Sequence, residues 1–421
     1  MITKRWSYAT AVAAATAVVL AGCSASSSSE PSASDGPVTL TYWDFLDPSQ
    51  DNPRSNALEE NIANFEAANP DITIDLSVVS LGDMLNRLPQ SAAAGQAPDV
   101  FKMFTPTVPQ MAAAGAYSPL PEAASEITDW LRPPSNLVGP DGQQVAVPYE
   151  YRTCAFYYNQ KILDQIGAEV PTTYEDVVDV AGKAGAAGFT GFGTGFSDTD
   201  NSAIISTFFD CFMSQVGEPI WNDDGEAEFA GTAADEFGQI LADLRDSGGL
   251  GTSVVSDSYS TVTDGLTNGT VAMAVLGSER VITLTGANPD IKWGPLPEPT
   301  SGGTTGATLG WTLGIGAGTD HTDAAWKFIE YMTGAEAGAV MATGGEIPTR
   351  ASTYDAEYFS TPEAETVKTV ADYVESNSEP HTYSDDWIGV ASGLSAAGQS
   401  LYLNKTSGSE FITAAQDAIN E

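Results

Sequence analysis

The stretch from Val145 to Asn159 constrains the fold most, because it reads as two strands in succession. Its sequence is V-A-V-P-Y-E-Y-R-T-C-A-F-Y-Y-N: an alternating β-branched run, a break at Pro148, tyrosines beside Glu150 and Arg152, and a second apolar run. Proline cannot donate to a β-ladder, so Pro148 suits the end of a strand. The pattern predicts a segment that crosses between two domains with a ligand cleft between them. The alternative is one bent strand with a tyrosine-rich core face.

The first 37 residues predict export. Residues 1–22 combine Lys4 and Arg5 with a short apolar run and end in Leu-Ala-Gly before Cys23, which is typical of a secretory signal peptide. Leu-Ala-Gly-Cys is similar to a lipobox, which implies that Cys23 becomes the lipidated first residue of a bacterial lipoprotein. The alternative is a plain cleavage site that leaves Cys23 as a free thiol. Residues 23–37 are rich in Ser and predict a flexible tether beside the membrane.

Length and charge restrict the remaining chain. About 385 residues are too many for one core and predict two domains. The net charge of −40, from 56 acidic and 16 basic residues, argues against nucleic acid or anionic lipid as a partner. The carboxylates are spread along the chain without a long block, which favours a solvated surface over a cation site. No later stretch is apolar for long enough to span a membrane.

Strand and helix patterns alternate after the tether. Val38 to Phe45 alternates like a half-buried strand, and the next segments predict helix 55–69, strand 72–79, helix 81–94 and strand 99–104. This spacing favours βαβ units and a mainly parallel sheet, with ligands at the carboxyl ends of its strands. The further predicted elements are helices 159–167, 173–187, 201–216, 233–247 and 324–331, a short helix near Trp130, strands 189–196 and 271–276, and a second crossing at 291–299.

Two smaller features are the remaining cysteines and a segment that looks like a calcium loop. Cys154 and Cys211 remain once Cys23 is lipidated, and in an exported protein they form either one disulfide or two buried thiols; their spacing does not decide. The run from Trp221 to Gly225 lacks the alternating oxygen ligands of a calcium loop, so it predicts an ordinary Asp-Gly turn.

The order of short motifs along the chain is similar to that of one known family. The motifs are the lipobox leader, T-L-T-Y-W-D-F, F-E-A-A-N-P-D-I, A-A-G-Q-A-P-D-V-F, G-A-Y-S-P-L, V-A-V-P-Y with Y-Y-N-Q-K-I-L, G-P-L-P-E-P, G-W-T-L-G-I, A-A-W-K-F-I-E-Y-M and I-P-T-R. They resemble extracellular solute-binding protein family 1, the carbohydrate-type substrate-binding lipoproteins of ATP-binding-cassette (ABC) importers. No single motif is diagnostic, but the resemblance covers essentially the whole mature chain.

This resemblance implies an α/β protein with a two-lobed, type II periplasmic-binding-protein-like fold. Each lobe would be a mainly parallel sheet flanked by helices, with residues 38–150 and 298–350 in the N-lobe and residues 151–297 and 351–421 in the C-lobe. The lobes would be joined by hinge crossings and close over a ligand. The implied function is to capture a sugar or oligosaccharide and deliver it to the membrane permease. The protein would be a lipid-anchored monomer on the outer face of the cell membrane, without catalysis, cofactor or metal.

The resemblance also implies a set of ligand-binding residues. Aromatic rings would cover the C–H faces of a sugar, while charged groups bond its hydroxyls. Glu279 departs from the family, because many sugar binders place Trp there. The implied residues are Trp43, Asp44, Phe104, Tyr149, Glu150, Tyr151, Arg152, Trp221, Glu279, Trp311, Arg350 and Trp387.

Other functions stay open at this stage. A secreted glycoside hydrolase needs only two carboxylates, which this chain has in excess. His321 and His381 are its only histidines, and it lacks the Gly-x-Ser-x-Gly, His-Glu-x-x-His and Walker motifs. A binder of another solute is also possible: a polyamine would suit Asp44, Glu150 and Asp386, and a glycerol phosphate would suit Arg152, Arg280 and Arg350. No repeats support an adhesin.

Overall fold

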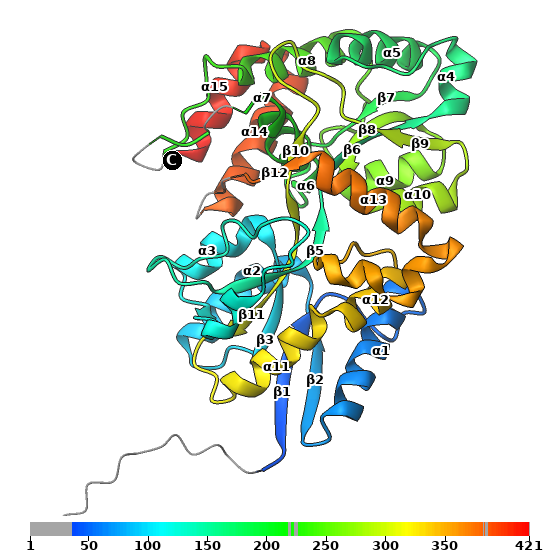
Figure 1. Ribbon diagram of the computed structural model, residues 1–421. Coiled ribbons are helices and arrows are strands. Elements are labelled where there is room, and N and C mark those ends of the chain that lie inside the picture. The colour runs from blue at the N-terminus through cyan, green and yellow to red at the C-terminus, as the bar shows by residue number, and fades with distance from the viewer. Residues whose placement is uncertain (1–35, 218–219, 223–225, 382, 384–385, 421) are drawn as a thin grey trace, which may run out of the picture. The chain divides into compact units, whose positions relative to one another are not determined.

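The structure, a computed structural model, describes residues 36–217, 220–222, 226–381, 383 and 386–420 (Figure 1). The predicted signal peptide, Cys23 and nearly all of the tether lie outside the described residues. The same holds for Asp223 to Gly225 of the predicted turn. Within the described ranges, every helix is too short or too polar to cross a bilayer.

One lobe is built around a six-stranded sheet. Its strands are β1 (Val38–Asp44), β2 (Ile72–Val78), β3 (Val100–Phe104), β4 (Tyr117–Ser118), β5 (Ala146–Arg152) and β11 (Leu309–Gly316). The order is β2-β1-β3-β11-β4, and β5 also pairs with β11. The helices of this lobe are α1 (Pro53–Ala68), α2 (Leu81–Ala93), α3 (Val108–Ala113), α11 (Thr322–Met332) and α12 (Ala335–Thr343).

The other lobe is built around a four-stranded sheet, which lies above the first in Figure 1. Its order is β7 (Thr190–Gly193), β8 (Val271–Gly277), β6 (Cys154–Asn159) and β9 (Ile291–Gly294). A separate short pair joins β10 (Gly306–Ala307) to β12 (Ser378–Glu379). The α-helices here are α4 (Gln160–Ile166), α5 (Tyr174–Ala186), α6 (Ser202–Ile205), α7 (Ser214–Val216), α8 (Ala234–Asp246), α9 (Tyr259–Thr267), α10 (Arg280–Ala287), α13 (Glu365–Ser376), α14 (Trp387–Asn404) and α15 (Gly408–Ile419).

The α/β class and the two lobes are as predicted, but the prediction of mainly parallel sheets is wrong. In the first sheet β1 is parallel to β2 and β3, whereas β11 is antiparallel to β3, β4 and β5. In the second sheet only β7 and β8 are parallel. The run in β11 is buried along its whole length, and such a run signals burial without giving strand direction. Strand β11 enters from the other lobe, so it runs against β3.

The first crossing between the sheets is one residue long. Arg152 pairs with Leu309 in the first sheet, and Cys154 pairs with Gly277 in the second. Thr153, between them, is fully buried, and its N–H donates to Ser278 Oγ at 3.1 Å. The segment therefore contains two strands of different sheets, and the single bent strand is excluded. The strand end expected at Pro148 is wrong, because Pro148 lies inside β5 opposite Thr312, and the break comes at Thr153.

The second crossing lies later than 291–299. Ile291 to Gly294 form β9 of the second sheet, and Glu298 still bridges to Thr173 in that lobe. The chain enters the first sheet only at Leu309. Proline content marked a stiff segment there, but not the place where the chain changes lobes.

Local signals account for most helix positions, with two exceptions. Thr173 caps α5 in a capping box with Asp176, as its sequence predicts. The predicted helix 201–216 is instead α6 and α7 on either side of a π-helix, Ser206–Met213, whose phenylalanines fill the core of the second lobe. The short helix expected near Trp130 is a 3-10 turn at Glu122–Glu126, and Trp130 itself bridges to Arg350.

Candidate functional site

A cavity of about 550 Å³ opens between the two lobes, a volume in the range of small-molecule sites. The first lobe contributes one end of α2, the end of β3 and the start of β11. The second lobe contributes residues 199–206, the π-helix, the loop after β8 and the start of α14. Five of the sequence-predicted residues line this cavity, namely Phe104, Arg152, Glu279, Trp311 and Trp387.

Trp311 forms an aromatic wall with Phe104. The two residues are directly opposite in the β3–β11 pair, and their rings lie 5.4 Å apart. A β-bulge follows Trp311, and bulges re-aim side chains beside functional sites. Gly310 precedes it at a φ of 141°, where a Cβ would meet Glu150 O at 1.7 Å, so this position requires glycine. The buried Nε1 of Trp311 has no hydrogen-bond partner.

Trp387 stands on the opposite side of the cavity, as the first residue of α14. Asp386 caps this helix by accepting from Gly389 N. The Trp387 ring meets Tyr383 at 5.4 Å and Phe209 at 6.3 Å, both edge to face. It is 6% exposed, so its orientation is set by these packing contacts.

Asp44 and Glu150 lie behind the cavity, in a chain of buried ion pairs that begins in the first lobe. Lys102 is fully buried, and its Nζ lies 3.6 Å from both Asp44 Oδ2 and Glu346 Oε1. The same nitrogen lies 4.5 Å from the centre of the Phe45 ring. Glu346 also pairs with Arg54 at 2.5 Å. Burial opposes the charge on Glu346, but Lys102 and Arg54 outweigh it and lower the pKa of this carboxyl.

The ion-pair chain continues across the junction of the lobes. Arg54 contacts Glu150 at 3.3 Å, and Glu150 contacts Arg152 at 2.9 Å. Arg152, the last residue of β5, then reaches Glu279 of the second lobe at 3.2 Å, and Glu279 lies 3.4 Å from Arg280. The charges alternate in sign along these eight residues, so each of the four carboxylates in this set contacts a cation. We call this set, which begins at Asp44 and ends at Arg280, the ion chain.

Glu279 is held at the cavity wall by more than charge. Tyr259 Oη donates to Glu279 Oε1 at 3.0 Å, and Gly277 N donates to the same hydroxyl at 2.9 Å. Burial raises the pKa of Glu279, but Arg152 and Arg280 together lower it below its ordinary value. Its Oε2 is buried without a partner. The site therefore presents an ionised carboxylate with one oxygen unoccupied.

The remaining predicted residues do not line the cavity. Trp43 packs under Arg87, Tyr149 packs against Lys102, and Tyr151 donates to Arg132 O. Tyr149 and Tyr151 alternate along β5 with Glu150 and Arg152, and alternate residues of a strand face opposite sides. Trp221 packs beside Phe209 in the second-lobe core, and Arg350 pairs with Asp129 over the Trp130 ring.

Arg280, which the sequence suggested only for a glycerol phosphate ligand, also lines the cavity. The other cavity residues were missed by the sequence analysis. They are Leu81, Gly82, Leu85, Asn86, Thr107, Thr199 to Ser202, Ile205, Ser206, Asp210, Tyr259, Gly277, Leu309, Ile388 and Ala391. Asp210 carried a usable signal, since it is the only charged residue in the apolar run S-T-F-F-D-C-F-M. The structure buries it to 2% exposure, and burial raises the pKa of its carboxyl well above the ordinary value although Arg152 opposes this.

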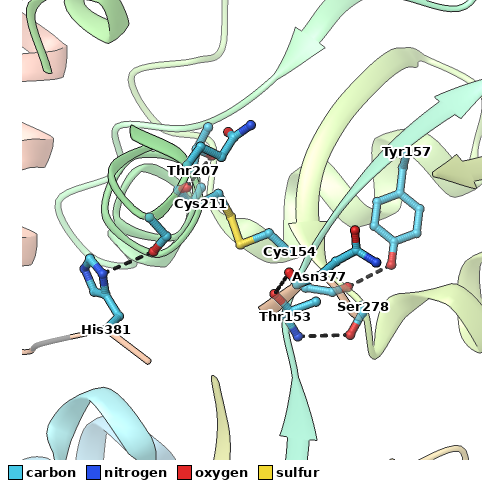
Figure 2. Close-up of a disulfide and its surroundings, with 12 residues drawn as sticks. Thr153, Cys154, Tyr157, Thr207, Cys211, Ser278, Asn377 and His381 are labelled. Carbon is cyan, nitrogen blue, oxygen red and sulfur yellow. Dashed lines mark hydrogen bonds between the residues drawn. A yellow bond between two sulfur atoms is a disulfide. The ribbon is translucent and has the colours of Figure 1, made fainter. Parts of the chain in front are cut away.

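Cys154 and Cys211 form a disulfide, which decides between the two states left open by the sequence. The bond joins the first residue of β6 to the π-helix, one residue after Asp210 (Figure 2). Directly after the π-helix, at the first residue of α7, Ser214 Oγ lies 3.1 Å from His381 Nδ1. The disulfide thus fixes the cavity wall of the second lobe to the strand that leaves the crossing.

Metal binding has no visible basis in the part of the chain that the structure describes. No group of three or more His, Cys, Asp or Glu side chains there is arranged to hold an ion. Among the charged side chains around the cavity, Arg152, Glu279 and Arg280 contact each other, whereas Asp210 has no ion pair with a described residue.

Solved structures with the same fold come from several bacteria. The GacH receptor of Streptomyces glaucescens, solved unliganded and with acarbose, is 20% identical with a TM-score of 0.71 over 90% of this chain and 97% of its own. Maltose-bound MalE3 of T. maritima is 18% identical with a TM-score of 0.74 over 91% and 99%. The cyclic α-maltosyl-1,6-maltose binding protein of Arthrobacter globiformis is 20% identical with a TM-score of 0.73 over 91% and 98%.

Sequence comparisons give a family. A protein of Brucella abortus named as a binding protein is 24% identical over 276 residues, which are 64% of this chain and 66%, just under two thirds, of its own length. Residues 51–339 match the family described as bacterial extracellular solute-binding protein. This match covers more than half of the chain, so the chain belongs to the bacterial extracellular solute-binding protein family.

Proposed function

We propose that this protein captures a sugar or oligosaccharide in the interlobe cavity and delivers it to the permease of an ABC importer. The observation that carries the proposal is the composition of the cavity. Aromatic rings from both lobes, Trp311 and Phe104 on one side and Trp387 on the other, face polar side chains around a volume of about 550 Å³. A sugar has apolar C–H faces and polar edges, and it needs both kinds of surface.

Unpartnered polar atoms support a ligand rich in hydroxyls. Trp311 Nε1 and Arg152 Nε are buried donors, while Glu279 Oε2 and Asp210 Oδ1 are buried oxygens, and none has a hydrogen-bond partner. Buried polar groups are normally satisfied, so each one left open at a cavity calls for a partner from outside the protein. Hydroxyl groups can serve all four, because each can donate and accept.

The relatives support the same ligand class. The proteins with this fold were solved with acarbose, maltose, D-tagatose, cycloalternan, maltotriose and mannobiose. We extend this to the present chain as a proposal: sugar binding without a catalytic step, in a lipid-anchored monomer held at the outer face of the cell membrane through Cys23. Residues 38–150 with 298–350, and 151–297 with 351–421, are the proposed lobes that close over the sugar.

The ion chain suggests how the lobes are kept in register. Arg152 belongs to the first sheet, contacts Glu279 of the second lobe, and also lines the cavity. A sugar bound there would touch a side chain that is already shared by the two lobes. Asp44 and Glu150 are then proposed to act through Lys102 and Arg152 rather than by touching the ligand.

A panel of ligands tests the proposal on the purified soluble domain from Asp35 onward. Maltose, maltotriose, mannobiose, D-tagatose and acarbose would be compared with spermidine and glycerol 3-phosphate by thermal shift and calorimetric titration. A ligand at 100 times its Kd stabilises the folded state by about 2.7 kcal/mol. We expect a saturable shift with one class of sugar.

Paired tryptophan variants separate the cavity from general effects. Trp311→Ala should abolish the shift, whereas Trp293→Ala should keep it, because Trp293 lies on β9 against Tyr373 and outside this cavity. A shift with spermidine alone would replace sugar by polyamine as the ligand class. No shift with any sugar, in a protein that unfolds cooperatively, would overturn the carbohydrate assignment.

A further inference from the structure

Asp210 differs from every other buried carboxylate in the described residues. Five carboxylates are buried there, and four of them, Asp44, Glu150, Glu279 and Glu346, each contact a Lys or Arg side chain. Among the described residues, the Asp210 side chain has no ion-pair or hydrogen-bond partner, and its Oδ1 is buried. It nevertheless lines the cavity.

An unpaired buried carboxyl destabilises the protein that carries it. Burying a polar group without a hydrogen bond is costly, and an isolated charge costs more. The fold could avoid this cost with an apolar residue, since the neighbours of Asp210 in sequence are Phe209 and Cys211 and both are buried in the second-lobe core. Buried polar groups normally have a hydrogen-bond partner, so a polar group without one at a cavity wall is expected to find its partner in the ligand.

The position of the carboxyl is fixed from two sides. Asp210 lies in the π-helix Ser206–Met213, a geometry that is rare and concentrated at functional sites. The next residue is tied to β6 by the Cys154–Cys211 disulfide. Phe209, the preceding residue, packs against Trp387 at 6.3 Å. The carboxyl is therefore held at the end of the cavity where Trp387 lies.

We propose that Asp210 determines the specificity of the cavity, by forming the hydrogen bond that recognises one hydroxyl of the sugar at the Trp387 end. This rests on the sugar-binding function proposed above. A sugar that presents a hydroxyl there satisfies the carboxyl, whereas a deoxy sugar or an epimer leaves it buried and unpaired. The wrong sugar therefore binds more weakly, because its complex leaves the Asp210 carboxyl buried without a hydrogen bond, and this costs binding free energy.

The first test measures sugar affinities in four proteins. Wild type, Asp210→Ala, Asp210→Asn and the control Asp243→Asn would be titrated with maltose, maltotriose, mannobiose and D-tagatose. Asp243 is exposed on α8, outside the cavity. Asp210→Ala should weaken the affinity for the tightest-binding sugar about 10- to 100-fold. It should also reduce the ratio between the affinities for the best and the worst sugar. Asp210→Asn should recover part of the loss, because an amide can also donate and accept. Equal affinities in all four proteins would overturn the proposal.

The second test needs no ligand and separates this proposal from the sugar assignment. Asp210→Asn and Asp210→Leu should unfold at the same or a higher temperature than wild type in the absence of sugar, since they remove an unmet carboxyl. Lower unfolding temperatures in both variants would show that Asp210 supports the fold, which contradicts the proposal. If wild type binds no sugar in the panel, the sugar assignment fails, and stabilised variants would still identify Asp210 as a residue kept for a ligand.

Discussion

The two sides of the cavity treat buried charge in opposite ways. At the junction with the first lobe, eight side chains alternate in sign from Asp44 to Arg280, and each carboxylate touches a cation. On the π-helix side, the Asp210 side chain lies in a phenylalanine-rich segment without an ion pair or hydrogen bond to a described residue, and a disulfide holds this segment. Charges that are paired with each other fix the geometry of the protein. A buried carboxyl without a protein partner is available to a ligand.

Buried ion pairs of this kind add little stability beyond an apolar core, because desolvation offsets their attraction. Their expected contribution here is to fix one arrangement of the segments that meet at the crossing. Arg54 and Glu346 are 292 residues apart in sequence, yet both belong to the ion chain, in which Arg54 also contacts Glu150 of β5. Removing one member leaves an excess charge in a largely buried set, which costs more than the pair contributes.

The largest effect is expected from Glu150→Ala. This change leaves four cations facing three carboxylates in the ion chain, although Arg54 keeps Glu346 and Arg152 keeps Glu279. An uncompensated buried charge costs about 3–5 kcal/mol of unfolding free energy. Urea denaturation measures this against the exposed control Asp243→Asn. A loss under 1 kcal/mol would mean that water or rearranged neighbours replace the carboxylate, and the contrast between the two sides would disappear.

The disulfide side is broken by the double variant Cys154→Ala with Cys211→Ala. The bond closes a loop with a sequence separation of 57, and its removal should cost about 2–4 kcal/mol. Wild type with and without a reductant gives the matched comparison. If the double variant keeps the stability of oxidised wild type, the phenylalanine packing alone holds the π-helix.

Acid should affect the disulfide side through His381. Burial lowers the pKa of His381 to about 4, below its ordinary value near 6.5. Between pH 6.5 and about 4, the His381 imidazole is therefore protonated in the unfolded chain but neutral in the folded protein. Folding stability should fall on acidification across this window, by up to about 1.4 kcal/mol per pH unit.

The matched variant for this prediction is His381→Gln, studied by denaturation at several pH values between 4 and 7. The variant should lose the part of the slope that belongs to His381, while the acidic carboxylates titrate alike in both proteins. Identical slopes in the two proteins would show that the folded state accepts the proton at ordinary pH, and that this side is more open to water than its packing indicates.

The smallest effect is expected outside the cavity, at Asp129→Asn. Asp129 pairs with Arg350 near the surface, and its carboxyl is one third exposed, at 33%. Exposed pairs contribute about 0–1 kcal/mol, so both stability and sugar affinity should stay near wild type. A large loss of affinity would return Arg350 to the binding site, where the family resemblance had placed it.

The sequence determined some of these features and left others open. The two successive strand-like runs predicted a crossing, and Thr173 located the start of α5, because each depends on residues close in sequence. The strand end expected at Pro148 was wrong, since β5 continues to Arg152. The direction of β11 and the pairing of Arg54 with Glu346 depend on segments far apart, so no local pattern contains them. Trp311 was found through a motif, whereas Asp210 was hidden in a run that otherwise reads as core.

The Cys154–Cys211 bond also sets when the protein becomes ready to work. Disulfides persist in oxidising surroundings and are kept reduced in the cytosol. A newly made copy inside the cell would have the complete sequence but a cavity wall that is not yet tied to β6. Transfer across the membrane would then allow the bond that ties the π-helix to β6, so the oxidising environment outside the cell would complete this wall of the cavity.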